Sequence, residues 1–231
     1  MCGRFTQQIS WRELRDLYLL SGEPPTTGIE TKFNGAPTQD FVVCRLDEEG
    51  ERTVAILRWG LVPFWAKDKS IGSRLINARA ESVHSKPSFR NAFRSRRCLV
   101  PASGWFEWIQ SGARKQPFYI SLAARKPASF AAVWECWDRE GEPMETFSII
   151  TTAASSQLSN LHHRQPAVVP MGYFDDWLDP STNSNTLRDL VNTPNEGPYE
   201  YHAVSTRVNN VRNNEADILE PLSEQDLLGT T

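Results

Sequence analysis

The 231-residue sequence contains little cysteine, and its four cysteines stand far apart. Cys2, Cys44, Cys98 and Cys136 form no C-x-x-C pair, so neither a zinc site nor a disulfide framework is indicated. Thiols without such a pattern are typical of a reducing compartment, which favours a cytoplasmic protein. We expect Cys44, Cys98 and Cys136 to be buried thiols in strands.

Long apolar runs, internal repeats and coiled-coil patterns are also missing. No stretch approaches the roughly 18 apolar residues of a membrane span, and no apolar signal-peptide core is present, so we expect no membrane partner. The chain is 39% hydrophobic with 8 Trp and 11 Phe, enough for a sizeable core. We therefore expect one domain over residues 1–231, a monomer, and no metal or other cofactor.

The net charge of −3 is unevenly distributed along the chain. Residues 52–106 hold eleven Lys and Arg against two acids, a local charge of +9, and the remainder carries −12. A basic segment in an acidic chain is typical of a localised site for a polyanion. A solvated basic face is the alternative interpretation.

The hydrophobic pattern predicts paired strands with a few helices. Ser10 begins a capping box with Glu13, and a helix is predicted over 11–21, ending near Gly22, with Leu14 and Tyr18 inward. Because strands arrive as hairpins, we expect an α+β fold, a mainly antiparallel curved sheet or open barrel with flanking helices. The predicted hairpins are 41–47 with 53–59, 104–110 with 117–122, and 129–137 with 145–152; helices are predicted at 88–97, 174–178 and 184–191, and a strand at 200–205.

Three arginines recur at helical spacing within the basic segment. Arg90, Arg94 and Arg97 are predicted to face outward from the helix at 88–97, while Phe89 and Phe93 anchor its other side. This face is interpreted as a phosphate-binding ridge or as a merely soluble surface.

The sequence opens on "MCGRF", with Cys2 directly behind the initiator methionine. A methionine before a small residue is ordinarily removed, so we expect a mature chain that begins at Cys2. Its α-amine, with a pKa of ~7.7–8.0, is then partly neutral at physiological pH, and its thiol supplies a second nucleophile. Such a 1,2-aminothiol can capture an aldehyde as a thiazolidine. The alternative is that a cysteine at this position has no role.

Four internal stretches place polar groups where a purely structural role is hard to assign. "PFWAK" (63–67) sets Trp65 for stacking on a nucleobase or for plugging a turn. "LINARAES" (75–82) interrupts an apolar run with Asn77 and Arg79, which point the same way in an extended segment, and a structural Asn that bonds backbone groups is the alternative. "GWFEW" (104–108) sets Glu107 among aromatic residues, where burial would raise its pKa toward that of a proton shuttle if the side chain turns inward. An outward-facing Glu without a role is the alternative. "LHHRQP" (161–166) supplies His162, whose adjacent histidine cannot share a strand face with it.

Taken together, the motifs resemble the SOS-response-associated peptidase (SRAP) family of abasic-site-processing proteins. The resemblance covers nearly the whole chain in order. It is carried by "MCGRF", "KFNGAPT", "RWGLVPFWAKD", "LINARAES", "CLVPASGWFEW", "SIITTAA", "LHHRQP" and "HAVSTRVNNVRN".

The resemblance implies binding to single-stranded DNA that contains abasic sites, and a thiazolidine DNA–protein crosslink through Cys2 that shields the lesion during the DNA damage response. It matches Asn77, Glu107 and His162 to the other active-site positions. Glu107 would shuttle protons during sugar ring opening, and His162 would act as an acid or base, orient the reactants and promote reversal. The positions matched to DNA contacts are Arg4, Asn34, Trp65, Arg79, Thr151 and Arg164. The expected location is cytoplasmic, at the nucleoid when the protein is bound to DNA.

Two other functions remain open from the sequence. Cys2, His162 and Glu107 can be interpreted as the thiol, base and orienting group of a peptidase that removes its own Met1 or cleaves other proteins. A DNA-binding module without chemistry is the second alternative. Whether a lyase step accompanies crosslinking of the abasic site is also left open by the sequence. Loss of activity on replacing Cys2 separates covalent capture from simple binding.

Overall fold

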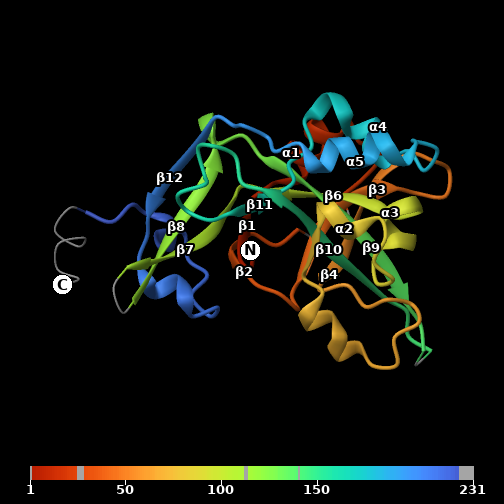
Figure 1. Cartoon of the computed structure of the whole chain (residues 1–231), viewed down its shortest axis with the longest axis horizontal. Helices are drawn as coiled ribbons and strands as arrows, with labels where there is room; N and C mark the ends of the chain where they lie inside the picture. The colour runs from red at the N-terminus through yellow and green to blue at the C-terminus, as the bar shows by residue number, and fades with distance from the viewer. Residues whose placement is uncertain (1, 25–28, 112–113, 140, 224–231) are drawn as a thin grey trace.

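The structure is a computed structural model that describes residues 2–24, 29–111, 114–139 and 141–223. It contains two β-sheets with a few short helices around them (Figure 1). The strands are β1 (Phe5–Gln7), β2 (Lys32–Gly35), β3 (Asp40–Leu46), β4 (Arg52–Trp59), β5 (Asn77–Arg79), β6 (Arg97–Ala102), β7 (Gly104–Ser111), β8 (Arg114–Leu122), β9 (Ala128–Trp137), β10 (Met144–Ala153), β11 (Arg164–Pro166) and β12 (Tyr199–Ala203). The α-helices are α1 (Trp11–Tyr18), α2 (Ala80–Val83), α3 (Arg90–Ser95), α4 (Phe174–Leu178) and α5 (Ser184–Asn192).

One sheet includes a five-stranded barrel. Strands β4, β3, β6, β9 and β10 pair in that order, and β10 closes the ring by a parallel pairing with β4. The short strands β5 and β11 add to β10 at the rim. This arrangement confirms the predicted α+β fold with few helices, and it makes the barrel mixed because of its one parallel pairing.

The second sheet runs β12-β8-β7-β1-β2 and is antiparallel throughout. In Figure 1, β7, β8 and β12 lie on the left, the barrel lies on the right, and β1 and β2 lie between them. The buried side chain of Gln7 joins β1 to the barrel, because its amide donates to Val42 O (3.0 Å) and Pro101 O (2.9 Å). Strand β1 therefore ties the second sheet to the barrel.

The three predicted hairpins are confirmed as β3–β4, β7–β8 and β9–β10. Gly112 and Glu140, which the sequence placed in two of their turns, lie outside the described residues. The Ser10 capping box is present, but α1 ends at Tyr18 because Leu19 adopts a left-handed conformation with φ 54°. The helix predicted at 88–97 is shorter, since strand β6 already begins at Arg97.

Two predictions about single side chains were wrong. Arg97 does not face outward; it is 3% exposed and donates to the carbonyl oxygens of Phe93 and Trp177, which ties α3 and α4 to the barrel. Cys136 lies in strand β9 but is exposed, whereas Cys44 and Cys98 are buried as predicted.

Among the described residues, none of the helices combines the length and apolar character that a bilayer crossing requires.

Candidate active site and DNA-binding surface

Cys2 lies just before β1 and is held by Asn77 of β5, a strand of the other sheet. Its backbone carbonyl accepts a 2.7 Å hydrogen bond from Asn77 Nδ2, and its side chain is fully buried. Asn77 is positioned by β5, which pairs in parallel with β10, and by the Trp59 indole, which donates to the neighbouring Ile76 O at 2.9 Å. The buried Oδ1 atom of Asn77 has no hydrogen-bond partner within the described chain. This oxygen can therefore accept a hydrogen bond from a donor near Cys2.

Glu107 is brought to Cys2 by the antiparallel pairing of β1 and β7. Phe5 lies opposite Trp105, and Phe106 N donates to Arg4 O at 3.0 Å. Continuing this register places Glu107 beside the segment that carries Cys2, and the negative charge of Glu107 contributes to the raised pKa of that thiol. The fold thus brings the predicted carboxylate to the N-terminal cysteine, although the two stand more than one hundred positions apart.

Burial sets the protonation of both groups. The Glu107 side chain is 3% exposed, and this desolvation raises its pKa to about 7. At neutral pH both its acid and its carboxylate forms are therefore populated, as a proton shuttle requires. Burial raises the pKa of the Cys2 thiol strongly, with Glu107 as the second cause, so the thiol is protonated at neutral pH.

His162 follows β10 and is half-buried at the same rim of the barrel. Its Nδ1 lies 2.9 Å from Arg164 N and 3.1 Å from Arg164 O. A backbone N–H can only donate, so Nδ1 is an acceptor and the proton of the neutral ring sits on Nε2. Burial is the main cause that lowers the pKa of His162, which keeps the ring neutral at physiological pH. The ring also stacks on His163, with centroids 4.3 Å apart.

Three predicted DNA contacts come together on β5, β10 and β11. Arg79 is exposed and stands opposite the buried Thr151 in the β5–β10 ladder. Arg164 donates to Thr151 O and pairs with both oxygens of Glu81 on α2, at 3.0 Å for the Nη2 contact. Sequence reasoning missed Glu81, whose signal was its place two residues after Arg79. Two arginines and one counter-ion thus form a surface beside Asn77.

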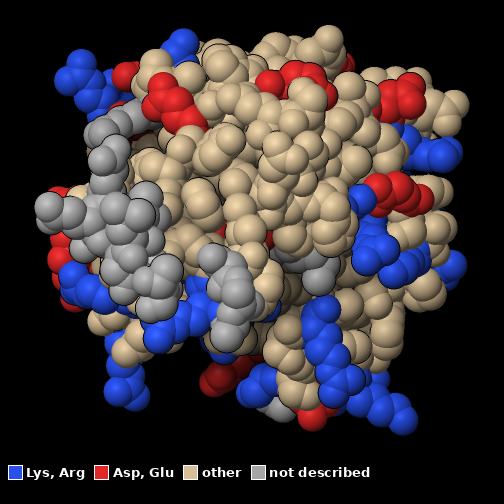
Figure 2. All heavy atoms as spheres, turned by 60° about the vertical axis from the view of Figure 1, so that its left-hand side comes forward, with Lys and Arg blue, Asp and Glu red and all other residues tan. Residues whose placement is uncertain are grey.

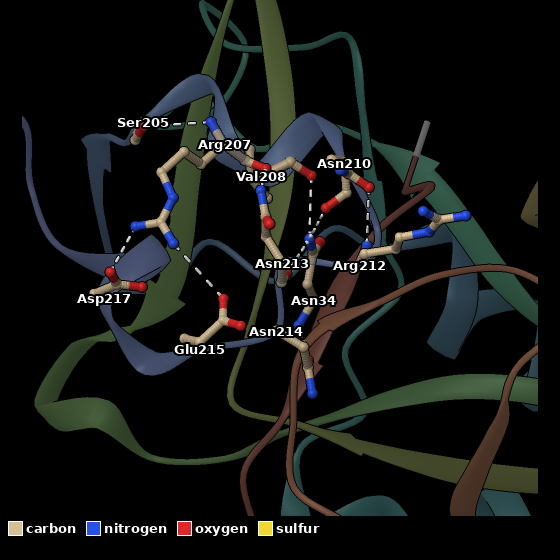
Figure 3. A network of polar contacts seen from close by, with 10 residues as sticks. All are labelled: Asn34, Ser205, Arg207, Val208, Asn210, Arg212, Asn213, Asn214, Glu215 and Asp217. Atoms are coloured by element: carbon tan, nitrogen blue, oxygen red, sulfur yellow. Dashed lines mark hydrogen bonds and ion pairs between the residues drawn. The ribbon is translucent and has the colours of Figure 1, made fainter.

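Asn34 is held in a network with the loop after β12 (Figure 3), and Arg4 bonds to both Asn34 and this loop. Figure 3 shows the Asn34 amide pointing into that loop, where Nδ2 donates to Val208 O, Asn210 O and Asn213 O at 3.2, 3.1 and 2.7 Å. Arg4 Nη1 donates to Asn34 Oδ1 (2.6 Å) and Val208 O (2.8 Å). Because Asn34 is 1% exposed, its side chain holds Arg4 and the loop in place rather than lying open at the surface.

The "PFWAK" loop presents its aromatic residues instead of burying them. Phe64 and Trp65 are 52% and 44% exposed. Two hydrogen bonds fix the loop to β9: Phe64 N donates to Glu135 Oε2 at 3.2 Å, and Trp137 Nε1 donates to Ala66 O at 2.9 Å. The stacking interpretation therefore agrees better with the geometry than a turn plug does. Sequence reasoning missed Phe64 as a candidate, although it adjoins Trp65.

Glu135 is a buried carboxylate with a structural task at this loop. It is 3% exposed and pairs with Arg96 while accepting from the Phe64 amide. Glu135→Ala leaves both groups without their partner, so we expect stability to fall by about 2–4 kcal/mol. Amide exchange at Phe64 is expected to accelerate relative to wild type.

Glu145→Ala is the matched control, because Glu145 pairs with Arg45 on the barrel but bonds no amide of the loop. Equal acceleration of Phe64 exchange in both variants would contradict the role given to Glu135.

The basic segment supplies much of the exposed positive charge. Lys67, Lys69, Arg74 and Arg79 are all exposed on or beside the loop and β5. On the face drawn in Figure 2, most Lys and Arg lie over the lower half and the right side, and most Asp and Glu lie along the upper part and the edges. Within the described residues, no group of three His, Cys, Asp or Glu side chains is arranged to hold a metal ion.

The chain is similar to known proteins over nearly its whole length. The family model described as "SOS response associated peptidase (SRAP)" matches residues 1–211. Abasic site processing protein YoaM of Bacillus subtilis is 34% identical over 223 residues, which cover 95% of this chain and 98% of YoaM. YedK of Escherichia coli, also named an abasic site processing protein, is 29% identical over 235 residues, covering 96% and 100%. A crystal structure of a protein from Bacteroides thetaiotaomicron superposes with a TM-score of 0.84 at 25% identity, covering 96% and 100%.

Proposed function

This chain belongs to the SOS response associated peptidase family of abasic site processing proteins, and we propose that it captures abasic sites in single-stranded DNA as a thiazolidine on Cys2. The observation that carries the proposal is the pairing of Cys2 with Glu107. Asn77 holds the backbone carbonyl of Cys2 in place, and a buried carboxyl group with a pKa of about 7 lies beside this residue.

The reaction begins at the α-amine of Cys2, which is free only when Cys2 is the first residue of the chain. We therefore propose that Met1 is removed first. The amine attacks the aldehyde carbon of the ring-opened sugar and gives a carbinolamine, which loses water to form an imine. Sγ then adds to the imine carbon, and the thiol proton ends on the ring nitrogen. The net change is one C–N bond and one C–S bond formed, with one water released.

The neighbouring groups move the protons of these steps. Glu107 in its acid form donates to the sugar oxygen during ring opening and to the departing hydroxyl, and its carboxylate accepts protons from the amine and the thiol. The Nε2–H group of His162 donates a hydrogen bond to the reacting groups, since Nδ1 is occupied by accepting from Arg164 N. The Oδ1 atom of Asn77, which has no partner within the described chain, is proposed to accept from the α-amine of Cys2 once Met1 is removed.

The raised thiol pKa supports this order of steps and opposes a general peptidase. A peptidase nucleophile attacks as a thiolate, whose population at neutral pH is suppressed by the burial of Cys2. Thiazolidine closure requires only a thiol whose proton has an acceptor nearby. Closure also consumes the imine from which a strand-cleaving lyase step would proceed, so we propose that any lyase activity is minor.

The DNA strand is proposed to lie across the rim of the barrel. Arg79 and Arg164 bind phosphates there, next to Thr151, and Trp65 stacks on a base. Arg164 exchanges its ion pair with Glu81 for a phosphate. Arg4 takes a phosphate from the other side, with Asn34 as the residue that positions it. Because these contacts are electrostatic, binding is expected to weaken as salt increases.

The experiment that tests the function uses protein whose Met1 has been removed, incubated with single-stranded DNA that carries one abasic site. A slowly migrating band that survives denaturation is expected with this DNA and is expected to be absent with the same strand carrying an intact base. No band from protein with a verified free Cys2 amine would overturn the proposal and leave non-covalent binding as the function to test.

A further inference from the structure

A cavity of about 370 Å³ lies between the β2–β3 turn and the segment after the aromatic loop, and the site described above does not use it. The segment that forms one wall is a 3-10 helix over Lys69–Arg74. The polar side chains that line the cavity come from three places in the chain and are Thr38, Arg58, Lys69, Ser70 and Ser73. Because its lining comes from separate segments, no single sequence motif predicts this cavity.

Two glycines bring the walls of this cavity together. A Cβ atom on Gly72 would lie 2.6 Å from Gly60 O, and one on Gly60 would lie 2.7 Å from Gly72 O. Gly60 also has φ +122°, a conformation that other residues avoid. Only glycine at both positions lets the 3-10 helix rest on the end of β4. This contact sets Lys69 and Arg58 around one space.

The cavity is suited to an anion. Two cations and three hydroxyl residues line it, of which Ser73 Oγ already donates to Ser70 O at 2.8 Å, and no Asp or Glu is among its described lining. Of the two acids placed beside these cations, Asp68 caps the 3-10 helix by accepting from Ser70 N at 2.7 Å, and Asp40 is the cross-strand neighbour of Arg58 on the same face of the β3–β4 ladder. Hydroxyl and guanidinium donors around a concave space are the groups that bind phosphate oxygens.

Thr38 supplies a strained edge to the same cavity. It is a β-branched residue with φ 72°, in the left-handed region, and its N–H donates to Trp59 O at 2.8 Å. Such a conformation costs on the order of 1–3 kcal/mol and persists where surrounding structure enforces it, which is frequent at ligand sites. The strain holds the exposed Thr38 at the mouth of the cavity.

The cavity adjoins the proposed DNA path. Trp59 lines it, and the indole of Trp59 donates to Ile76 O, one residue before Asn77. The chain between Gly60 and Lys69 is the loop that exposes Phe64 and Trp65. A strand whose base stacks on Trp65 therefore has this cavity as its neighbour.

We infer that the cavity binds a backbone phosphodiester of the single strand, outside the lesion itself, through Arg58 and Lys69. The inference rests on the proposed function for the presence of DNA. It assigns to this chain a subsite that extends the strand beyond the contacts of Arg79 and Arg164.

The test measures binding of Arg58→Gln and Lys69→Gln, singly and together, to an intact single strand of about 20 nucleotides at several salt concentrations. Losing one phosphate contact is expected to reduce the slope of log K against log salt by about 0.7 and to weaken binding several-fold at low salt. Arg188→Gln on α5 is the matched control, because Arg188 is exposed and removes the same charge from another element. A slope equal to that of the control would overturn the inference.

Two further readouts separate the possible failures. Adduct formation by the wild-type chain on abasic DNA tests the proposed function alone, so a normal adduct with an unchanged slope counts against the subsite only. Titration with inorganic phosphate, followed by ³¹P line broadening, tests for a free anion. Phosphate binding that depends on Arg58, together with an unchanged DNA slope, would mean that the cavity takes a free phosphate and not DNA, and would equally overturn the inference.

Discussion

Replacing Cys2 by alanine is expected to lower the yield of denaturation-resistant adduct at least 100-fold. The variant keeps the α-amine, so it still forms an imine with the abasic aldehyde, but it has no sulfur to close the thiazolidine ring. Borohydride should therefore trap Cys2→Ala on abasic DNA, while without borohydride the imine hydrolyses during denaturation. The measurement is a denaturing gel of the same reactions run with and without the reductant.

The control for this prediction is the binding of intact DNA. The Cys2 side chain is fully buried, and its substitution removes no phosphate contact, so affinity for an intact strand is expected to stay within about twofold of wild type. An adduct from Cys2→Ala that resists denaturation without borohydride would show that another nucleophile captures the lesion.

Glu107→Gln is expected to give a more stable but much slower protein. Burial raises the Glu107 pKa from 4.5 to about 7, so between these pH values the folded state binds more protons than the unfolded state. The free energy of unfolding of the wild type therefore falls as pH rises through this window, by about 3 kcal/mol in total. Glutamine does not ionise, so at pH 8 the variant is expected to exceed wild type by up to this amount.

The rate of adduct formation is expected to move in the opposite direction. Loss of a positioned proton shuttle typically costs 10²-fold or more, so Glu107→Gln should form adduct about 100-fold more slowly. Wild-type rates should be highest near pH 7, where both forms of Glu107 are present, and the variant should lose this dependence. Denaturant unfolding at pH 5 and pH 8 checks the expected change in stability, and a pH–rate profile checks the expected change in rate.

Glu200→Gln on β12 is the matched control for these measurements, because Glu200 is exposed and far along the sheet from Cys2. It should alter neither the pH dependence of stability nor the rate. A stability gain in Glu200→Gln equal to that in Glu107→Gln would mean that net charge, and not burial, explains the effect.

Local features of this chain could be predicted from its sequence because short-range physics determines them. The three hairpins follow from alternating apolar strands around turn residues, and the Ser10 cap follows from its spacing to Glu13. The raised pKa of Glu107 followed from its aromatic neighbours. The closure of the barrel could not be predicted, because β4 and β10 pair in parallel across a separation of many residues.

Side chains that bind distant backbone groups were also beyond prediction. The spacing of Arg97 fits an outward helical face, yet carbonyl groups of α3 and α4 surround it, and only the assembled fold supplies them. Asn34 likewise bonds a loop more than 170 positions away. Glu135 is isolated in its strand, and its partner amide belongs to the aromatic loop. A motif identifies a residue type, and the fold decides which groups it meets.

Mapping the adduct at the residue level tests most directly whether the Cys2 amine and thiol together capture an abasic site. The reaction of Met1-processed protein with abasic single-stranded DNA is treated with a thiol-alkylating reagent under denaturing conditions, digested, and analysed by mass spectrometry. We expect the DNA remnant on the N-terminal peptide, with loss of one water, and a Cys2 thiol that resists alkylation while Cys136 is alkylated. A remnant on another residue, or a Cys2 thiol alkylated within the adduct, would contradict this capture by Cys2.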